Sequence, residues 1–155
     1  MAEIVSATSS CIICVDRSVK PTYPDWMQKL MHPELGCTGP IEYDLFSDVE
    51  LWLHENQKNG VATGNTIYEY LKSTNALGSC LNLQDGLAIQ QQGITVFREL
   101  FKGEAAFLWA SVGQSRTADL RVPYLCEFGD LVMVDWFWFD YYWKSRHPAL
   151  RFRSK

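Results

Sequence analysis

Several features that would reveal a protein's class are missing from this sequence of 155 residues. No run of about 18 apolar residues is present, so the sequence predicts no membrane span. Residues 1–10 contain no lysine or arginine, which argues against a secretory signal. Apolar residues make up 47% of the sequence and charged residues 21%, values that exclude a disordered chain. We therefore expect a cytoplasmic protein with a single domain over residues 15–155, preceded by an irregular leader or short strand over residues 1–14.

The motifs of common catalytic sites are missing as well. The sequence has no G-x-S-x-G, no P-loop and no H-E-x-x-H, and its three histidines, His32, His54 and His147, are isolated. The one enzymatic alternative is a small site near His54 and the turn at Gly60–Asn65, where amides at the start of a helix could receive an anion. Capping of that helix explains the turn more simply, so we favour a protein that is not an enzyme.

Cysteine is present but does not form a recognisable framework. The count is five, and an odd number argues against a disulfide scaffold. Cys11 and Cys14 are closely spaced, but zinc needs four ligands and no second pair exists. Both lie in a β-prone run, Cys11–Val15, rather than at the start of a helix, where a thiolate would be stabilised. We expect reduced structural thiols, no metal and no cofactor.

Charge is unevenly distributed along the chain. The net charge is −4, but residues 141–155 carry +5 without a single acid, so residues 1–140 carry −9. An acidic body is a poor general binder of nucleic acid. The end of the chain is interpreted as a basic tail that either is solvated or meets a phosphate or an acidic partner. Its cations are Lys144, Arg146, Arg151, Arg153 and Lys155.

Hydrophobic periodicity before Gly103 is mostly helical. We expect helices over Asp25–Met31, over Ser47–Gly60, where a Ser-x-x-Glu pattern is typical of a capping box, and over Asn65–Ser73. A further helical pattern from Leu83 to Phe101 contains two glycines that could divide it into two helices.

After Gly103 the pattern becomes strand-like. Strands are expected over Ala105–Val112, Leu120–Phe128 and Leu131–Phe139, with a polar loop over 113–119 and a hairpin turn at Gly129–Asp130. The predicted fold is α+β, with N-terminal helices packed on a C-terminal three-stranded antiparallel meander.

The two-residue turn also fixes the hairpin register, because the residues flanking it must pair. One face of the hairpin is then nearly all apolar and should lie on the helices, with Asp135 satisfied by the Tyr124 hydroxyl. The other face should place Arg121 over Trp138 as a cation–π pair. Pro123 lacks an amide donor, so its strand should be an edge or bulged there. The further aromatic residues expected on this second face are Phe107, Trp109 and Trp136.

This aromatic face is the strongest functional signal, although residues 1–46 or the tail could instead cover it. Flat aromatic surfaces bury a large area at low entropic cost. We expect a small non-enzymatic binding or inhibitor-type protein that engages a macromolecular partner, preferably a protein, through this face and the basic tail. The alternatives are a nucleotide or nucleic acid stacked on the tryptophans, or a phage-borne or mobile-element anti-defence protein. The residues predicted to bind are Trp109, Arg121, Trp136, Trp138, Trp143, Lys144, Arg146, Arg151 and Arg153.

Five short strings carry a resemblance to a group of short uncharacterised bacterial proteins from poorly cultured lineages or their mobile elements. The strings are Tyr23–Trp26, Met31–Leu35, Trp52–His54, Ile67–Leu71 and His147–Phe152. The resemblance covers about residues 15–152 and brings no activity with it. It implies one self-contained domain for which the Cys11/Cys14 pair is not essential.

Overall fold

The centre of the protein is a seven-stranded sheet. A computed structural model describes residues 10–102 and 104–154 of the chain, and the structural findings refer to these residues. Each strand pair of the sheet is antiparallel except β6 with β11, which is parallel. The strand order is β2 (Met27–Leu30), β7 (Gly113–Ser115), β8 (Leu120–Phe128), β6 (Ala106–Phe107), β11 (Ala149–Phe152) and β4 (Val49–Trp52), and β9 (Leu131–Trp138) pairs with the other edge of β8.

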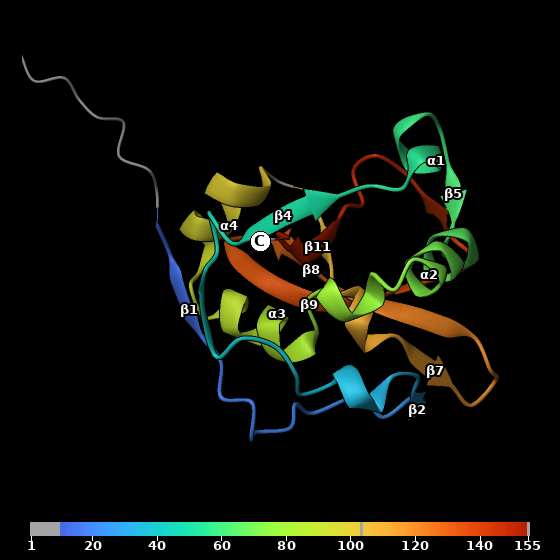
Figure 1. Cartoon of the computed structure of the whole chain (residues 1–155), viewed down its shortest axis with the longest axis horizontal. Coiled ribbons are helices and arrows are strands. Elements are labelled where there is room, and N and C mark those ends of the chain that lie inside the picture. Colours follow the sequence, from blue (N-terminus) through green and yellow to red (C-terminus); the bar gives the residue numbers. More distant parts are fainter. Residues whose placement is uncertain (1–9, 103, 155) are drawn as a thin grey trace, which may run out of the picture.

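Two small ribbons and several short helices complete the fold (Figure 1). The ribbons are β1 (Ile12–Cys14) with β3 (Glu42–Asp44), and β5 (Ala62–Thr63) with β10 (Tyr142–Trp143). The α-helices are α1 (Glu55–Lys58), α2 (Gly64–Ser73), α3 (Leu83–Gln90) and α4 (Ile94–Phe101), and the 3-10 helices are η1 (Pro33–Leu35), η2 (Leu77–Ser79) and η3 (Trp109–Ser111). None of the helices in the described part of the chain has the length and apolar character needed to cross a membrane.

The predicted three-stranded meander under N-terminal helices is wrong, because strands from both halves of the chain build the sheet. The expected helix over Asp25–Met31 is strand β2, and the expected helix over Ser47–Gly60 contains strand β4 and only the single turn α1. Both strands depend on partners distant in sequence: β2 pairs with β7, and β4 pairs with β11. Long-range pairing therefore overrides the local helical signal.

The other helical predictions are confirmed. The Asn65–Ser73 segment forms α2, and the 83–101 pattern is divided at Gly93, whose φ of +90° is favourable only for glycine. Gly64 begins α2 directly beside the backbone of Phe139, where a Cβ atom would lie 2.7 Å from the Phe139 Cα. The predicted helix end at Gly103 and the predicted leader over residues 1–9 lie outside the described residues, but β1 confirms the strand expected near residue 12.

The predicted hairpin is confirmed in register along its whole length. The eight pairs run from Arg121 with Trp138 to Phe128 with Leu131, closed by a turn at Gly129, whose φ is +62°. The prediction for Pro123 is wrong, because β8 has neighbours on both sides. Pro123 is tolerated where β6 ends, and its carbonyl accepts a hydrogen bond from the Leu108 amide at 2.9 Å.

Both faces of this hairpin are covered, but at opposite ends. We call the end at Gly129 the turn end and the end where Arg121 pairs with Trp138 the base; α3 and α4 lie beside the turn end, and α2 lies beside the base (Figure 1). On one face, Leu125 packs with α3 and α4 in the first hydrophobic core. On the other face, Val122 packs with α2 in the second core.

Two quarters of the hairpin therefore remain uncovered by helices. At the turn end the open quarter carries Phe128 and Leu131, which are 70% and 65% exposed. The prediction that this whole face lies on the helices is wrong here. At the base the open quarter lies on the opposite face and carries Arg121 and Trp138.

The predicted basic tail is also wrong. Residues 142–152 supply β10 and β11, and β11 lies inside the sheet between β6 and β4. Its residue Leu150 is fully buried in the first core. Apolar residues between the cations explain this outcome, because Ala149 and Leu150 gain more by burial than a solvated tail could. Lys155 lies outside the described residues.

Candidate functional site: a stacked arginine at the base of the hairpin

The open quarter at the base is a stack of aromatic rings around one arginine. The Arg121 guanidinium lies 4.5 Å from the Trp138 ring centroid, which confirms the predicted cation–π pair, and 4.3 Å from that of Trp26. Tyr141 extends the stack beyond Trp138, with nearly parallel rings 6.1 Å apart. Trp136 closes the other end, edge-on to Trp26 at 5.2 Å. Two rings thus contact the cation directly, and two further rings pack against them.

A short turn between β7 and β8 supplies the counter-charge. The Arg121 Nε donates to Asp119 Oδ2 at 3.0 Å, and Asp119 also accepts hydrogen bonds from the Ser115 and Thr117 hydroxyls. These hydroxyls, together with Arg121, lower the pKa of Asp119 to about 2. Ala118 adopts a left-handed φ of +72° within this turn, which aims Asp119 back at the arginine.

Two cavities flank the stack. The cavity on the Trp26 side has a volume of about 440 Å³ and is lined by Asp25, Trp26, Ser115, Arg116, Thr117 and Arg121. The cavity on the Trp138 side has a volume of about 510 Å³ and is lined by Thr63, Asn65, Thr117, Ala118, Asp119, Leu120, Trp138, Phe139 and Asp140. Both are open, wide enough for a side chain and rich in hydrogen-bonding groups, as recognition sites commonly are.

A basic loop continues this surface beyond Tyr141. Tyr141 also packs edge-on against Phe137, and a cavity of about 350 Å³ beside them is lined by Lys144, Arg146 and His147 and by one acid, Asp140. Burial and the charges of Arg146 and Lys144 lower the pKa of His147 to about 4, so the imidazole is neutral at pH 7. Its Nδ1 accepts the Lys144 amide at 2.9 Å, which leaves the proton on Nε2.

The predicted binding residues separate into four groups, of which the fourth consists of Arg151 and Arg153. Arg121, Trp136 and Trp138 come together in the stack, and Lys144 and Arg146 lie in the neighbouring loop. Trp109 and Trp143 are 1% and 0% exposed in the second core.

The expectation that Trp109 and Phe107 join the stacked face is wrong. Strand β6 ends at Phe107, which lies on the opposite face from Arg121, and the chain then turns into η3, so Trp109 points inward.

The two remaining cations of the predicted set do not reach this site. Arg151 donates from Nε to Glu50 Oε2 at 2.6 Å across the β4–β11 pair, and Arg153 donates to the other oxygen of the same carboxylate at 3.4 Å. Arg151 also lies over the Trp52 ring. One carboxylate on the neighbouring strand thus pairs with both arginines and offsets one of their two charges, so neither arginine belongs to a solvated tail.

Trp26 and Asp119 are the residues that the sequence prediction missed. Trp26 was placed in a helix, because its position is set by the pairing of β2 with β7, which the local pattern of Met27–Leu30 does not indicate. Asp119 lies two residues before Arg121, and this Asp-x-Arg spacing at the start of a strand was a usable signal for a same-side ion pair.

Of the two features on which the enzymatic alternative depends, His54 has a structural role. His54 caps α1, its Nδ1 accepting the Asn56 amide at 3.0 Å, and its ring packs on Tyr70 rather than facing a cavity. The Gly60–Asn65 turn does reach the stack, because Thr63 and Asn65 line its larger cavity.

Cys11 is buried and Cys14 is exposed, so the two thiols point to opposite sides of β1.

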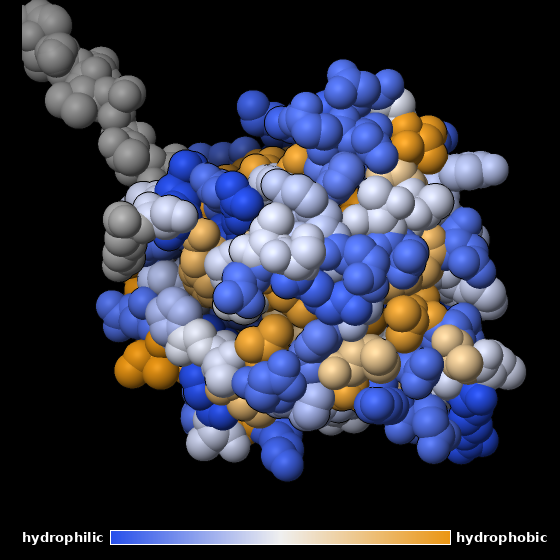
Figure 2. Space-filling view, turned by 45° about the vertical axis from the view of Figure 1, so that its right-hand side comes forward, coloured by the Kyte–Doolittle hydropathy of each residue, from blue (hydrophilic) through white to orange (hydrophobic). Residues whose placement is uncertain are grey.

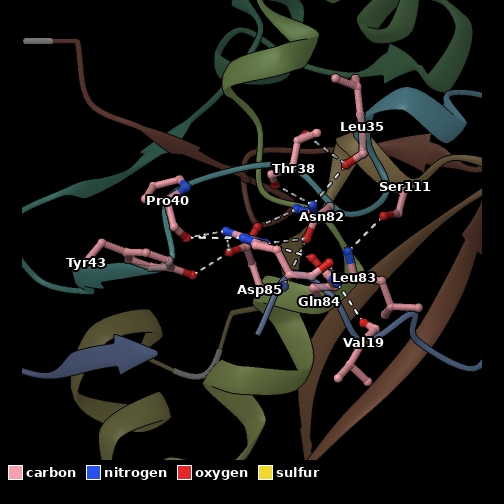
Figure 3. A network of polar contacts seen from close by, with 11 residues as sticks. Val19, Leu35, Thr38, Pro40, Tyr43, Asn82, Leu83, Gln84, Asp85 and Ser111 are labelled. Atoms are coloured by element: carbon pink, nitrogen blue, oxygen red, sulfur yellow. Dashed lines mark hydrogen bonds and ion pairs between the residues drawn. The ribbon is translucent and has the colours of Figure 1, made fainter. Parts of the chain in front are cut away.

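A second arginine cluster has a structural role. Arg17 binds Asp85, Asn82, Gln84 and the Pro40 carbonyl, and all three of its nitrogens donate (Figure 3). The Tyr43 hydroxyl donates to the same Asp85 oxygen at 2.7 Å. These bonds attach two loops to the first turn of α3, and the network leaves no nitrogen of Arg17 for a ligand.

Comparison with protein-family models, with curated proteins and with solved structures gives no match. The face of the molecule in Figure 2 mixes hydrophobic and hydrophilic residues in small separate patches. The interpretation of the stack therefore depends on its own chemistry.

Proposed function

We propose that this protein is a non-catalytic binding protein and that the stack of Trp26, Arg121, Trp138 and Tyr141 is its recognition site for a protein partner. The observation that carries the proposal is the exposure of the outer rings: Trp138 and Tyr141 are 39% and 50% exposed although their rings are stacked on each other. Exposed aromatic rings that are already ordered lose little entropy on binding, which is why they dominate protein interfaces.

The charges around the stack favour an acidic partner segment. Lys144 and Arg146 continue the surface beyond Tyr141, and neither forms an ion pair with a described residue. Such free cations at the rim of an aromatic centre provide charge complementarity to carboxylates. Arg151 and Arg153, which the sequence analysis expected to bind the partner, are not included in the recognition site, because Glu50 binds both.

Affinity capture followed by titration tests the proposal. The full chain is used to capture its partner from an extract of its native cell, and the purified pair is titrated by calorimetry. Trp138→Ala is expected to weaken binding about tenfold or more, because aromatic hot spots dominate interface energies.

Tyr70→Ala is the matched control. The exposed fraction of Tyr70, 45%, is similar to that of Trp138. Tyr70 packs on Trp52 and His54, away from the stack. It should leave affinity unchanged. Equal affinities of Trp138→Ala and the unaltered chain would place the interface elsewhere.

A further inference from the structure

We propose that Arg121 is the anchor of this site and that its ligand is a carboxylate, accepted end-on by the two terminal nitrogens Nη1 and Nη2 in the cavity beside Trp26. The inference rests on the proposed binding function and names the group that is recognised. Its basis is the set of directions from which the guanidinium can still be approached.

A planar guanidinium can be approached from five directions, its two faces and its three edges. Trp26 and Trp138 lie over the two faces, at 4.3 Å and 4.5 Å from their centroids. Asp119 accepts the Nε–H, and no described residue accepts a hydrogen bond from Nη1 or Nη2. A planar oxyanion can therefore bind only at the terminal edge, where two parallel N–H groups match the two oxygens of a carboxylate.

Comparison with Arg17 shows how completely an arginine of this molecule can be satisfied by protein acceptors. The side chain of Arg17 is 11% exposed and that of Arg121 is 20% exposed, so both are largely removed from water. Arg17 nevertheless donates from every nitrogen to a protein acceptor. Arg121 lies between two rings, and its two terminal nitrogens have no described acceptor beside an open cavity.

The rim of that cavity contains groups of both signs. Arg116 adds a second cation, whereas Asp25 would compete with a ligand carboxylate for the same edge. The Ser115 and Thr117 hydroxyls are already engaged with Asp119. We therefore expect removal of the Asp25 charge to strengthen ligand binding. Removal of the paired terminal N–H groups of Arg121, which we call its fork, should weaken it.

Nuclear magnetic resonance on the isotopically labelled full chain tests this assignment. The probe is a capped tripeptide with a central glutamate, and the same peptide with glutamine and inorganic phosphate are the comparisons. The signals followed are the indole N–H groups of Trp26 and Trp138 and the Arg121 Nε–H. The glutamate peptide is expected to shift all three saturably, about tenfold more tightly than its glutamine counterpart, since a charged bidentate bond is lost in the latter.

Two variants complete the test. Arg121→Lys keeps the charge without the fork and is expected to weaken the glutamate peptide about tenfold, followed on the two indoles. Asp25→Asn leaves the stack intact and is expected to strengthen it about threefold or more, since a competing charge is removed. Asp25→Asn remains informative even if the lysine variant loses its fold.

The proposal is overturned if the glutamate peptide causes no saturable shift, if it binds no better than the glutamine peptide, or if phosphate binds more tightly than both. Loss of carboxylate binding together with a partner that still requires Trp138 would reject only this inference. Carboxylate binding together with a partner indifferent to Trp138 would instead reject the proposed function.

Discussion

The two ends of the β8–β9 hairpin are each held by an arginine, and the two arginines are used differently. At the turn end, Arg98 of α4 reaches Glu127 at 3.1 Å, Asp130 at 3.3 Å and the Gly129 carbonyl at 3.3 Å. At the base, Arg121 has one carboxylate, Asp119, and two rings. Arg98 is 48% exposed and Arg121 is 20% exposed.

This difference shows what makes an arginine a recognition group. Arg98 donates from Nε and Nη2 to two carboxylates and a carbonyl, so a ligand at these nitrogens would have to displace those acceptors. Arg121 is oriented by ring contacts, which occupy its faces and leave donors free. Two carboxylates and a carbonyl fasten Arg98 to the turn end, whereas two rings and one carboxylate hold Arg121 at the base and leave both of its terminal nitrogens without a described acceptor.

The base also depends on the core beneath it, and breaking that support should have the largest effect. Trp109 packs on Trp143 and Phe139 in the second core. Trp109→Ala is expected to lower the free energy of unfolding by about 3–5 kcal/mol, because a large buried ring leaves a cavity. Chemical denaturation followed by circular dichroism measures this change.

Trp138→Ala is the comparison for this prediction. Trp138 is an exposed member of the stack, and its loss should lower the free energy of unfolding by only about 1 kcal/mol, the size of a cation–π contact. Similar losses in the two variants would mean that the stack is a structural part of the base rather than a surface presented to a partner.

The hairpin was predictable because its signals are local. Two residues, Gly129 and Asp130, fix the register of the eight pairs and so place Arg121 opposite Trp138. The Tyr124 hydroxyl meets Asp135 as expected, and burial and that carboxylate raise the pKa of Tyr124 to about 12. Half of the candidate site followed from this local geometry.

The other half depends on pairings that a local pattern does not contain. Trp26 reaches Arg121 only because β2 pairs with β7, more than eighty residues along the chain. Glu50 neutralises Arg151 only because β4 pairs with β11. A Ser-x-x-Glu pattern favours a helix locally, but these long-range partners determine the strand.

A smaller effect on the free energy of unfolding should depend on pH and should arise at the base. His147 packs on Phe137 at the base, and its pKa is lowered to about 4 from an ordinary value of about 6.5. Between these values the unfolded chain takes up a proton that the folded protein excludes, so stability is full above pH 6.5 and falls as the pH drops toward 4. The expected loss is about 1–3 kcal/mol in the free energy of unfolding.

The same pH range distinguishes the contribution of His147 to stability from that of Asp119. The pKa of Asp119 is lowered to about 2, so the stability that it contributes is present above about pH 4 and is lost only below. Denaturation at pH 7 and at pH 5 measures the histidine effect. His147→Asn keeps an acceptor for the Lys144 amide and should reduce the difference between the two pH values; an unchanged difference would assign it to other groups.

The smallest effect should come from the turn end. Arg98→Ala removes three contacts, but its acceptors are exposed and remain solvated, so the melting temperature should fall by about 3 °C or less. Partner affinity should not change, in contrast to Arg121→Lys. A loss of affinity in Arg98→Ala would show that the partner contacts the turn end, where Phe128 and Leu131 are exposed, and that open apolar area rather than an oriented arginine guides recognition. An unchanged affinity would leave the ring-held arginine as the feature that distinguishes the two ends, because both ends offer exposed apolar side chains but only at the base do both terminal nitrogens of the arginine lack a described acceptor.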